Sequence, residues 1–487
     1  MATVRYLDSD VVGVYEMGSD GKKQRIATLL WGDNVRVVKK SGDRYELDFM
    51  TREWNEETGK SEWKKHAAFI SAKAKFRDDP LMKVRFVDVG QGDAAMVETP
   101  KGQLVLIDGG EAQHLRRYFT ASWAYILRTK PVNIAAIVVS HGDADHFAGL
   151  PSLVDARRRS DKPAIVVDRV FHNGIVKGPS KAGKKILGRT VKTADGTFIT
   201  QLEDDLLAVP DGRMNTPFIA WKTAMQELKK RNKKLRVRRL EYGDDDAFDF
   251  LASEDVHVQV LGPITTDVKG KPALRYLHTP GSSGLSPSHT INGHSVVLRL
   301  TYGNVRMLFG ADLNAESEQT LLARAREDNK SLASEVLKVP HHGSADFSPR
   351  ILEAIQPVVS VVSSGDENAA KEYIHPRAGL VGALGRYSRG TVERPLIYVT
   401  EMVAFFKRLG RVAVHEYTDE TSDKERAKAI HVQNAYDKTV FGIVHIRTDG
   451  ERVLVATHSG RADKKEAYAF KVDANGAVEF EETVSVV

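Results

Sequence analysis

Four residues that can bind a metal lie within six positions of the stretch SHGDADH, directly after an apolar run. They are His141, Asp143, Asp145 and His146. Because the chain contains no cysteine, neutral imidazole and carboxylate are the side chains it has for holding a divalent cation. Alternating ligands in a tight loop can serve two metals, the first pair one metal and the second pair another. The alternative is a polar turn in which Asp or Ser caps a short helix.

Further residues of ligand type end other predicted strands. The stretches are LIDGG with Asp108, NGHSVVLRL with His294, LFGADLN with Asp312, and KVPHHGS with His341 and His342. Strand ends in an α/β protein meet at one edge of the sheets, so we expect these residues to converge. Two metals roughly 3.5–4 Å apart can hold the attacking and the leaving oxygen of a hydrolysis, and Asp312 has two oxygens with which to bridge them.

The bulk composition limits the class of protein. A chain of 487 residues is expected to form two or more domains. Its 41% hydrophobic and 28% charged residues are ordinary for a soluble globular protein. We see no apolar run long enough to cross a membrane and no signal peptide, and the lack of cysteine excludes disulfides, so we expect a cytoplasmic protein without a membrane partner. The net charge of +6 favours a polyanionic partner only where the charge is concentrated.

The chain divides into two predicted domains. Residues 1–78 alternate apolar and polar side chains between turns rich in Gly, Asp and Asn, which predicts a small all-β domain. Their pattern resembles a bacterial SH3-like domain, which we expect to dock a peptide or protein partner. Over residues 82–487, strands alternate with helices, which predicts an α/β domain. Within it, residues 152–288 are interpreted as a long insertion, and helices are predicted at about 217–231 and 314–326.

The second domain resembles a known family. Five stretches carry the resemblance: VRFVDVGQGDAAMVETPKGQLVLIDGG, SHGDADHFAGL, MLFGADL, LKVPHHGS and IHPRAGLVGAL. Together they resemble the metallo-β-lactamase-like hydrolase domain of ComEC-type competence DNA-channel proteins, over about residues 82–400 and a terminal hairpin, VFGIVHIRTDGERVLVAT. The resemblance implies an αββα sandwich with a metal site at one edge. It also implies a nuclease that degrades one DNA strand.

The resemblance implies a metal role for individual residues. His141, Asp143, Asp145 and His146 match the superfamily motif H-x-H-x-D-H, with Asp143 where the second His usually stands. Asp312 matches the bridging carboxylate. In the PHHGS stretch, His342 is the better match for the last ligand, and His341 is expected to contact substrate. ComEC-type sequences have Asn-x-x-Ser at the third ligand position, where this chain reads TINGHSVVL, so His294 or Asn292 is expected to fill it.

The carboxylate at position 143 affects which metal is expected. A carboxylate is a harder ligand than imidazole and adds negative charge. With Asp143, Asp145 and Asp312 the site contains three carboxylates. Oxygen-rich sites favour Mn²⁺ or Mg²⁺ more than histidine-rich sites do. We therefore expect two divalent ions, with Mn²⁺ favoured and Zn²⁺ or Mg²⁺ as alternatives.

Other polar residues are expected to support the chemistry. Asp145 could orient the attacking hydroxide as well as bind metal. His375, in EYIHPRAG, is the candidate acid or phosphate contact, and the alternative is an ordinary histidine at a helix entry. Asp88 and Asp93, in DVGQGD, and Asp108 could orient the histidine ligands from behind. A simple glycine turn is an equally good reading of DVGQGD.

The densest basic stretch is KKRNKKLRVRR, residues 229–239, with eight Lys or Arg in eleven positions. Such a run could follow a phosphate backbone. It could equally be a solvated helix end that the following GDDDAFD neutralises. The candidate nucleic-acid contacts are Lys229, Lys230, Arg231, Lys233, Lys234 and Arg236.

The sequence thus predicts a metal-dependent hydrolase. The favoured function is a phosphodiesterase or nuclease that acts on nucleic acid, single-stranded DNA first, through a hydroxide activated by two metals. One alternative is the hydrolysis of a small phosphate or carboxylic ester, because one fold serves many chemistries. The other is a binding protein with a decayed site.

Overall fold

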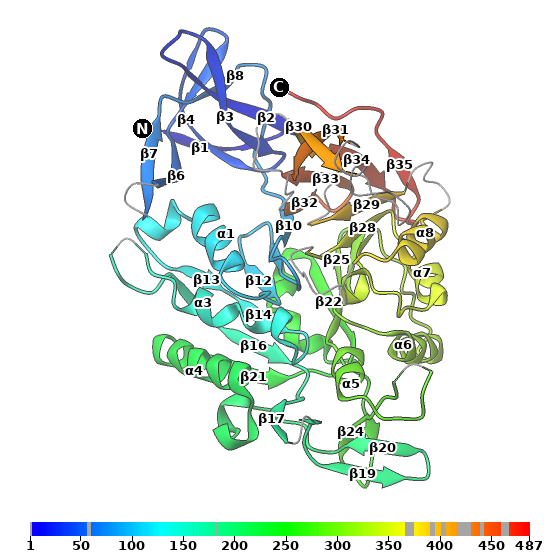
Figure 1. The fold of residues 1–487 in the computed structure, drawn as a ribbon. Helices are drawn as coiled ribbons and strands as arrows, with labels where there is room; N and C mark the ends of the chain where they lie inside the picture. Colours follow the sequence, from blue (N-terminus) through cyan, green and yellow to red (C-terminus); the bar gives the residue numbers. More distant parts are fainter. Residues whose placement is uncertain are drawn as a thin grey trace.

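The computed structural model describes residues 2–55, 60–158, 160–181, 184–279, 281–365, 375–389, 395–400, 406–415, 430–438, 443–458 and 467–487. The N-terminal region is all-β (Figure 1). Its seven-stranded sheet has the order β3-β2-β8-β5-β4-β1-β9, and β6 and β7 form a separate hairpin. The bounds are β1 Thr3–Leu7, β2 Val11–Met17, β3 Lys23–Leu30, β4 Asn34–Ser41, β5 Arg44–Leu47, β6 Phe49–Asn55, β7 Lys60–His66, β8 Phe69–Ser71 and β9 Phe76–Arg77. The all-β prediction is confirmed, and the SH3-like class stays a prediction.

Two sheets form the body of the second region (Figure 1). The first has ten strands in the order β21-β16-β14-β12-β11-β10-β32-β33-β34-β35, and the second has six in the order β22-β25-β26-β27-β28-β29. First-sheet bounds are β10 Met82–Val87, β11 Ala95–Glu98, β12 Leu104–Ile107, β14 Ala136–Val139, β16 Arg169–His172, β21 Arg236–Arg239, β32 Ile443–Thr448, β33 Arg452–His458, β34 Ala467–Val472 and β35 Val478–Phe480. Second-sheet bounds are β22 Val256–Gly262, β25 Val297–Tyr302, β26 Val305–Phe309, β27 Val336–Lys338, β28 Val359–Val362 and β29 Leu396–Val399.

The strands are apolar on both faces because both faces are covered. On β12, Val105 and Ile107 pack between the two sheets, whereas Leu104 and Leu106 pack outward against helices. The side chains of a strand alternate between faces, so one apolar run can serve two cores. The second sheet repeats this pattern: on β26, Phe309 faces the inner core and Leu308 faces the outer helices. The result is a helix–sheet–sheet–helix arrangement.

Helices cover the outer face of each sheet. The bounds are α1 His114–Ser122, α2 Ala144–Phe147, α3 Leu150–Val154, α4 Thr216–Arg231, α5 Pro287–Gly293, α6 Ala315–Glu327, α7 Pro349–Ile355 and α8 Ala378–Tyr387, with 3-10 turns η1 Ile126–Arg128, η2 Leu206–Ala208, η3 Asp211–Arg213, η4 Asp245–Glu254 and η5 Pro340–Gly343. The helices predicted at 217–231 and 314–326 are confirmed as α4 and α6. Asn215 and Asn314 cap them, each accepting a hydrogen bond from a first-turn N–H. None of the described helices is both long and apolar enough to cross a membrane.

The interpretation of residues 152–288 as one insertion is too broad. In this range, β16 and β21 extend the first sheet and β22 forms the edge of the second. The pieces outside the two sheets are smaller. They are the pair β13 Val132–Ile134 and β15 Ile165–Val167, the hairpin β17 Gly178–Lys181 and β18 Lys184–Ile186, and a four-stranded sheet of β19 Thr190–Thr193, β20 Gly196–Ile199, β24 Pro272–Arg275 and β23 Thr266–Asp267. The sequence pattern did not reveal these strands because they are short and contain polar residues.

The end of the chain closes the structure onto its beginning. The predicted terminal hairpin is β32 and β33, and β32 pairs antiparallel with β10. A further pair, β30 Phe406–His415 and β31 Ile430–Lys438, forms its own sheet. The backbone N–H of Val11 donates to the carbonyl of Ser485, 3.0 Å away. Arg452 of β33 binds Asp10 at 2.7 Å, so the N-terminal sheet is held against the first sheet of the sandwich.

Candidate metal centre

The candidate ligands lie at one edge of the sandwich, where strands of both sheets end. Strands β12 and β14 run parallel in the first sheet, and β26 and β27 run parallel in the second. The loops that follow them carry, in order, Asp108, the SHGDADH stretch, Asp312 and the histidine pair 341–342. The convergence expected of these strand ends is confirmed by the interatomic distances.

Two histidines and one carboxylate, His146, His342 and Asp312, form the centre of the group. His146 Nε2 lies 3.2 Å from His342 Nε2. Asp312 faces both rings, with Oδ1 at 3.3 Å from His146 Nε2 and Oδ2 at 3.3 Å from His342 Nε2. Asp145 Oδ2 completes the arrangement at 3.4 Å from His342 Nε2. Together with Asp93, the three central residues offer ligand atoms within 4.8 Å of one another, and all four are buried.

Hydrogen bonds behind the rings fix which nitrogens face the centre. His146 Nδ1 lies 2.8 Å from Asp108 Oδ2, and His342 Nδ1 lies 3.0 Å from the carbonyl of Ser363. Both partners can only accept, so each Nδ1 donates to its partner and each Nε2 is the nitrogen that faces the centre. The two Nε2 atoms lie 3.2 Å apart and Asp312 faces both, so the three side chains are placed to bind a cation between them. The donor set therefore fits a divalent metal.

The charges of the group agree with that fit. Burial opposes a charge on His146, but Asp312 and Asp108 raise the pKa of this histidine well above its usual value. Burial opposes a charge on His342 too, and Asp312 with Asp93 raises its pKa in the same direction. In both cases the carboxylates attract positive charge to the nitrogens that face the centre. A bound cation would satisfy the same attraction.

His141 offers a further nitrogen on the other side of Asp312. Its Nε2 is 3.8 Å from Asp312 Oδ2 and has no hydrogen-bond partner among the described residues. Its Nδ1 lies 3.0 Å from the hydroxyl of Ser140, which in turn donates to Asp108 at 2.7 Å. Burial, followed by the nearby His146, lowers the pKa of His141 to about 4. His141 is thus neutral at pH 7, which is the form that binds metal.

Asp143 begins a row of polar contacts beside the centre. Its carboxylate forms an ion pair with Lys177, which lies between β16 and β17. In the amide orientation that satisfies both of its polar atoms, Asn292 donates to Asp143 Oδ2 at 2.9 Å and accepts from His341 Nε2 at 3.2 Å. The ring of His375 follows, 6.3 Å from that of His341 between centroids. The structure thus brings Asp143, Asn292, His341 and His375 together, but as neighbours of the central group.

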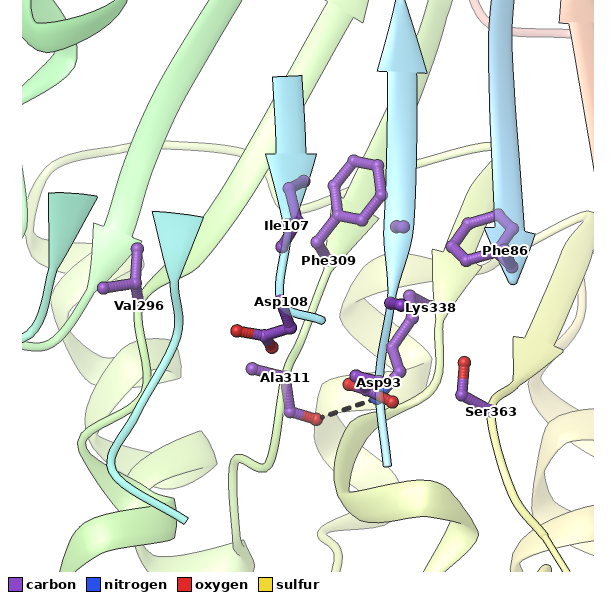
Figure 2. Close-up of a pocket in the computed structure, with 11 residues that line it drawn as sticks. Phe86, Asp93, Ile107, Asp108, Val296, Phe309, Ala311, Lys338 and Ser363 are labelled. Carbon is purple, nitrogen blue, oxygen red and sulfur yellow. Dashed lines mark hydrogen bonds and ion pairs between the residues drawn. The ribbon is translucent and has the colours of Figure 1, made fainter. Parts of the chain in front are cut away.

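A buried ion pair supports the centre from between the sheets. Lys338 of β27 pairs with Asp93 and also donates to the carbonyl of Ala311 at 3.2 Å (Figure 2). Asp93 Oδ1 lies 3.3 Å from His342 Nδ1. Burial would raise the pKa of Asp93, but Lys338 and His342 lower it, so this carboxyl is ionised. Apolar side chains, Phe86 and Phe309 among them, line the pocket around the pair (Figure 2).

The structure does not place His294 among the candidate ligands. Its Nε2 lies 2.6 Å from the carbonyl of Arg275, so this nitrogen carries a proton and donates it. The neighbouring residues explain the apparent departure from the family pattern. Asn292 and Ser295 are themselves spaced as Asn-x-x-Ser, and Ser295 Oγ lies 3.3 Å from His141 Nδ1. Asp88 accepts from the N–H of Gly90 at 3.1 Å, a contact that belongs to the glycine turn.

Four supporting residues were missed in the sequence: Ser140, Lys177, Ser295 and Lys338. Two of them carried a signal. Ser295 completes Asn-x-x-Ser, and Lys338 is a lone cation within the apolar strand EVLKV. A lysine that is only 3% exposed at a strand end needs a buried acid, which is Asp93 here. Ser140 and Lys177 carried no such signal, because their roles depend on contacts between distant loops.

The basic stretch 229–239 begins at the edge of the first sheet opposite the candidate ligands, and Arg239 ends β21 on the ligand side. Strands β14, β16 and β21 are parallel, and the ligands follow the carboxyl end of β14. Arg236 stands at the amino end of β21, where it pairs with Arg169 of β16. Lys229 and Arg231 donate to backbone carbonyls, and Lys230 pairs with Glu227. Lys233 and Lys234 are exposed there. The predicted contact of this stretch with a substrate at the metal edge has no support.

A family model of the metallo-beta-lactamase superfamily matches residues 87–216. That stretch contains Asp93, Asp108 and the whole SHGDADH loop. This region has the metallo-β-lactamase fold. Asp312 and His342 lie beyond the matched residues, on loops that follow strands of the second sheet.

Individual relatives are similar over shorter or weaker matches. The competence protein ComA of Neisseria gonorrhoeae is 38% identical over 86 residues, which are 18% of this chain and 12% of that protein. The match therefore spans about an eighth of the length of that relative. Among solved structures, YhfI from Bacillus subtilis, a metallo-beta-lactamase fold protein, is 10% identical with a TM-score of 0.31 and covers 65% of this chain and 96% of its own. A mutant of the CmlA beta-hydroxylase is 13% identical with a TM-score of 0.26, over 59% and 46% of the two chains.

Proposed function

We propose that the protein is a metal-dependent hydrolase of the ComEC type that cleaves phosphodiester bonds in nucleic acid. One observation carries the hydrolase part. The Nε2 atoms of His146 and His342 lie 3.2 Å apart, and Asp312 faces both. This buried set of two imidazoles and a carboxylate suits a divalent cation. The nucleic-acid part is supported by the likeness to a competence protein over 86 residues.

The residues that would hold metal divide into two groups around Asp312. Asp145, His146 and His342 would hold one cation, and His141 with Asp143 would hold the second. Bound divalent cations supply Lewis acidity to a phosphate oxygen and lower the pKa of the attacking water. The three carboxylates favour Mn²⁺ or Mg²⁺ over Zn²⁺.

The protein's own groups hold this arrangement in place. Asp108 accepts from both His146 and Ser140, and Ser140 accepts from His141, so one carboxylate orients two imidazoles. Asp93 and Lys338 do the same for His342 from the other side. Because these contacts are buried, the rings are oriented before substrate arrives.

His375 is suited to binding a phosphate oxygen. Burial, followed by the charges of His342 and His341, lowers the pKa of His375 to about 4. At pH 7 the ring is therefore neutral, and the imidazolium form that could protonate a leaving oxygen is scarce. A neutral ring N–H still donates a hydrogen bond. Of its two expected roles, proton donor and phosphate contact, we therefore propose the second.

A substrate and metal panel tests this proposal. The metal-free protein is given Mn²⁺, Mg²⁺ or Zn²⁺ and then single-stranded DNA, duplex DNA, RNA or bis(p-nitrophenyl) phosphate. We expect cleavage of a nucleic acid with Mn²⁺ and no cleavage without metal. Hydrolysis only of small esters would support the alternative function. Absence of hydrolysis with every metal and substrate would contradict the proposal.

A further inference from the structure

Eight basic residues gather in two segments next to the metal edge, 178–199 and 266–275, which we call the basic arm. The eight are Lys181, Lys184, Lys185, Arg189, Lys192, Lys269, Lys271 and Arg275, and the same segments contain two acids, Asp195 and Asp267. The formal charge of the arm is therefore +6, which equals the net charge of the whole chain. The other residues of the protein balance to zero. The two segments thus carry a clear excess of positive formal charge.

Five cations of the basic arm are exposed and have no acid beside them among the described residues. Arg189, Lys192, Lys269, Lys271 and Arg275 are all exposed. Within the part of the chain that the structure describes, no carboxylate lies within ion-pair distance of these five side chains. Exposed cations without acids beside them produce a positive potential that attracts a polyanion.

The basic arm is fastened to the metal edge by an apolar cluster. Leu187, Ile199 and Leu274 from the arm pack with Ile175 and Ile291. Ile291 directly precedes Asn292, and Ile175 is two residues before Lys177. Both isoleucines are therefore next to residues of the polar row beside the centre. The four-stranded sheet of the arm projects from the end of the sandwich near α5 and β17 (Figure 1).

A buried hydrogen bond gives the arm a second attachment. The Nε2 of His294 donates to the carbonyl of Arg275 on β24, 2.6 Å away. The next residue, Ser295, contacts the ring of His141 at 3.3 Å. Two adjacent residues therefore connect the arm and the metal centre. This contact gives His294 a role in place of metal binding.

We propose that the basic arm binds the phosphate backbone of a nucleic acid whose scissile bond lies at the metal centre. The inference rests on the proposed function for the substrate class and adds the surface that holds it. A small ester would need only the centre. Cations spread over several strands and held beside the centre match a polymer with repeated phosphates.

Two matched charge reversals test the basic arm. One variant carries Lys192→Glu, Lys269→Glu and Lys271→Glu. The control carries Lys230→Glu, Lys233→Glu and Lys234→Glu, an equal change on exposed residues of the 229–239 stretch. Binding of a labelled oligonucleotide, single-stranded or duplex, is followed by fluorescence anisotropy with EDTA present, so that no cleavage occurs. Thermal melting confirms that both variants fold.

We expect the arm variant to bind single-stranded DNA about tenfold or more weakly at 0.1 M salt. The slope of log affinity against log salt should fall by about 2, because each phosphate contact to a single strand contributes roughly 0.7. The control should keep the wild-type affinity and slope. Equal losses in both variants, no loss in the arm variant, or no binding by the wild type would overturn the inference. If the arm variant loses binding to vesicles containing phosphatidylserine but keeps its binding to oligonucleotide, the arm binds a membrane surface and the inference is overturned.

The outcome is separable from the proposed function. Hydrolysis of bis(p-nitrophenyl) phosphate by the wild-type protein depends on the metal centre and involves no polymer. If the wild type hydrolyses this ester but both variants bind oligonucleotide equally, the arm inference fails and the hydrolase stands. If oligonucleotide binding requires the arm but neither ester nor nucleic acid is cleaved, the hydrolase fails and the binding surface stands.

Discussion

Two regions of the molecule carry eight Lys or Arg each, and they differ in how the fold places them. In the stretch 229–239 the cations lie close together in sequence, and those before β21 lie at the edge of the sheet opposite the candidate ligands. In the basic arm they are spread over two segments that meet beside the metal edge. The comparison teaches that the density of charge along a chain does not locate a binding surface. Pairing and position in the fold decide it.

Acids pair with three of the eight cations of the 229–239 stretch, Lys230, Arg238 and Arg239, within the part of the chain that the structure describes. Arg238 binds Asp244 and Asp246, each at 2.8 Å, and Arg239 binds Asp204 and Glu241. The hydrogen bond that Arg238 donates to Asp246 is the largest of the interactions that raise the pKa of Arg238. These acids follow the run in GDDDAFD or come from the neighbouring loop. The alternative of a basic stretch neutralised by the acids after it therefore describes the structure better than a phosphate track does.

The largest expected effect separates chemistry from binding. Asp312→Asn removes the carboxylate that lies 3.3 Å from the Nε2 atoms of both central histidines, so turnover should fall by about 10³ or more. Oligonucleotide binding in EDTA should stay within about twofold of wild type, because the basic arm is untouched. Single-turnover cleavage and anisotropy measure the two quantities. Asp161→Asn, on an exposed loop, is the control and should behave as wild type in both. Full activity in the Asp312 variant would refute the assignment.

A smaller effect tests the link between the arm and the centre. His294→Leu removes the buried hydrogen bond to Arg275, so the free energy of unfolding should fall by about 1–3 kcal/mol. Oligonucleotide affinity should fall several-fold as the arm loosens, whereas the metal content of the protein should not change. Chemical denaturation, anisotropy and elemental analysis report these three quantities. His257→Leu, at an exposed position of β22, is the matched control. If the His294 variant loses one metal per chain, His294 is a ligand after all.

The smallest effect lies in the neutralised stretch. Arg238→Gln breaks ion pairs that are 39% exposed at the arginine, so the free energy of unfolding should fall by only about 0.2–1 kcal/mol. Oligonucleotide affinity should equal that of the wild type, as it should in Lys233→Gln, whose side chain is exposed. Urea denaturation and anisotropy check the pair. A drop in affinity as large as that of the arm variant would erase the difference between the two regions.

The convergence of the candidate ligands could be predicted from the sequence, because it depends on the order of the strands. The strand ends bearing SHGDADH, Asp312 and His342 meet as expected, since parallel strands finish at one edge. The direction of a side chain in a loop is not written in local spacing. His294 and Ser295 are adjacent, yet one bonds to Arg275 and the other contacts His141. Metal binding by the SHGDADH residues, Asp312 and His342 stays a prediction.

The limits of the insertion were misplaced for a related reason. Strands β16 and β21 are only four residues each, and β21 reads RVRR, without an apolar face of its own. β16 pairs with β14 and β21 pairs with β16, which makes both part of the first sheet, and no periodicity in the sequence indicates that pairing. Likewise, the basic arm unites two segments separated by the whole of α4 and β22. Its charge becomes visible only when the fold brings the segments together.

The central claim is that His146, His342 and Asp312 hold a divalent cation between them. The direct measurement is anomalous X-ray scattering from crystals grown with Mn²⁺, which locates the metal without reference to activity. We predict a peak within bonding distance of both Nε2 atoms and of Asp312, and its loss in His146→Ala. Crystals with no peak at these atoms, or with a peak only at surface carboxylates, would contradict the account.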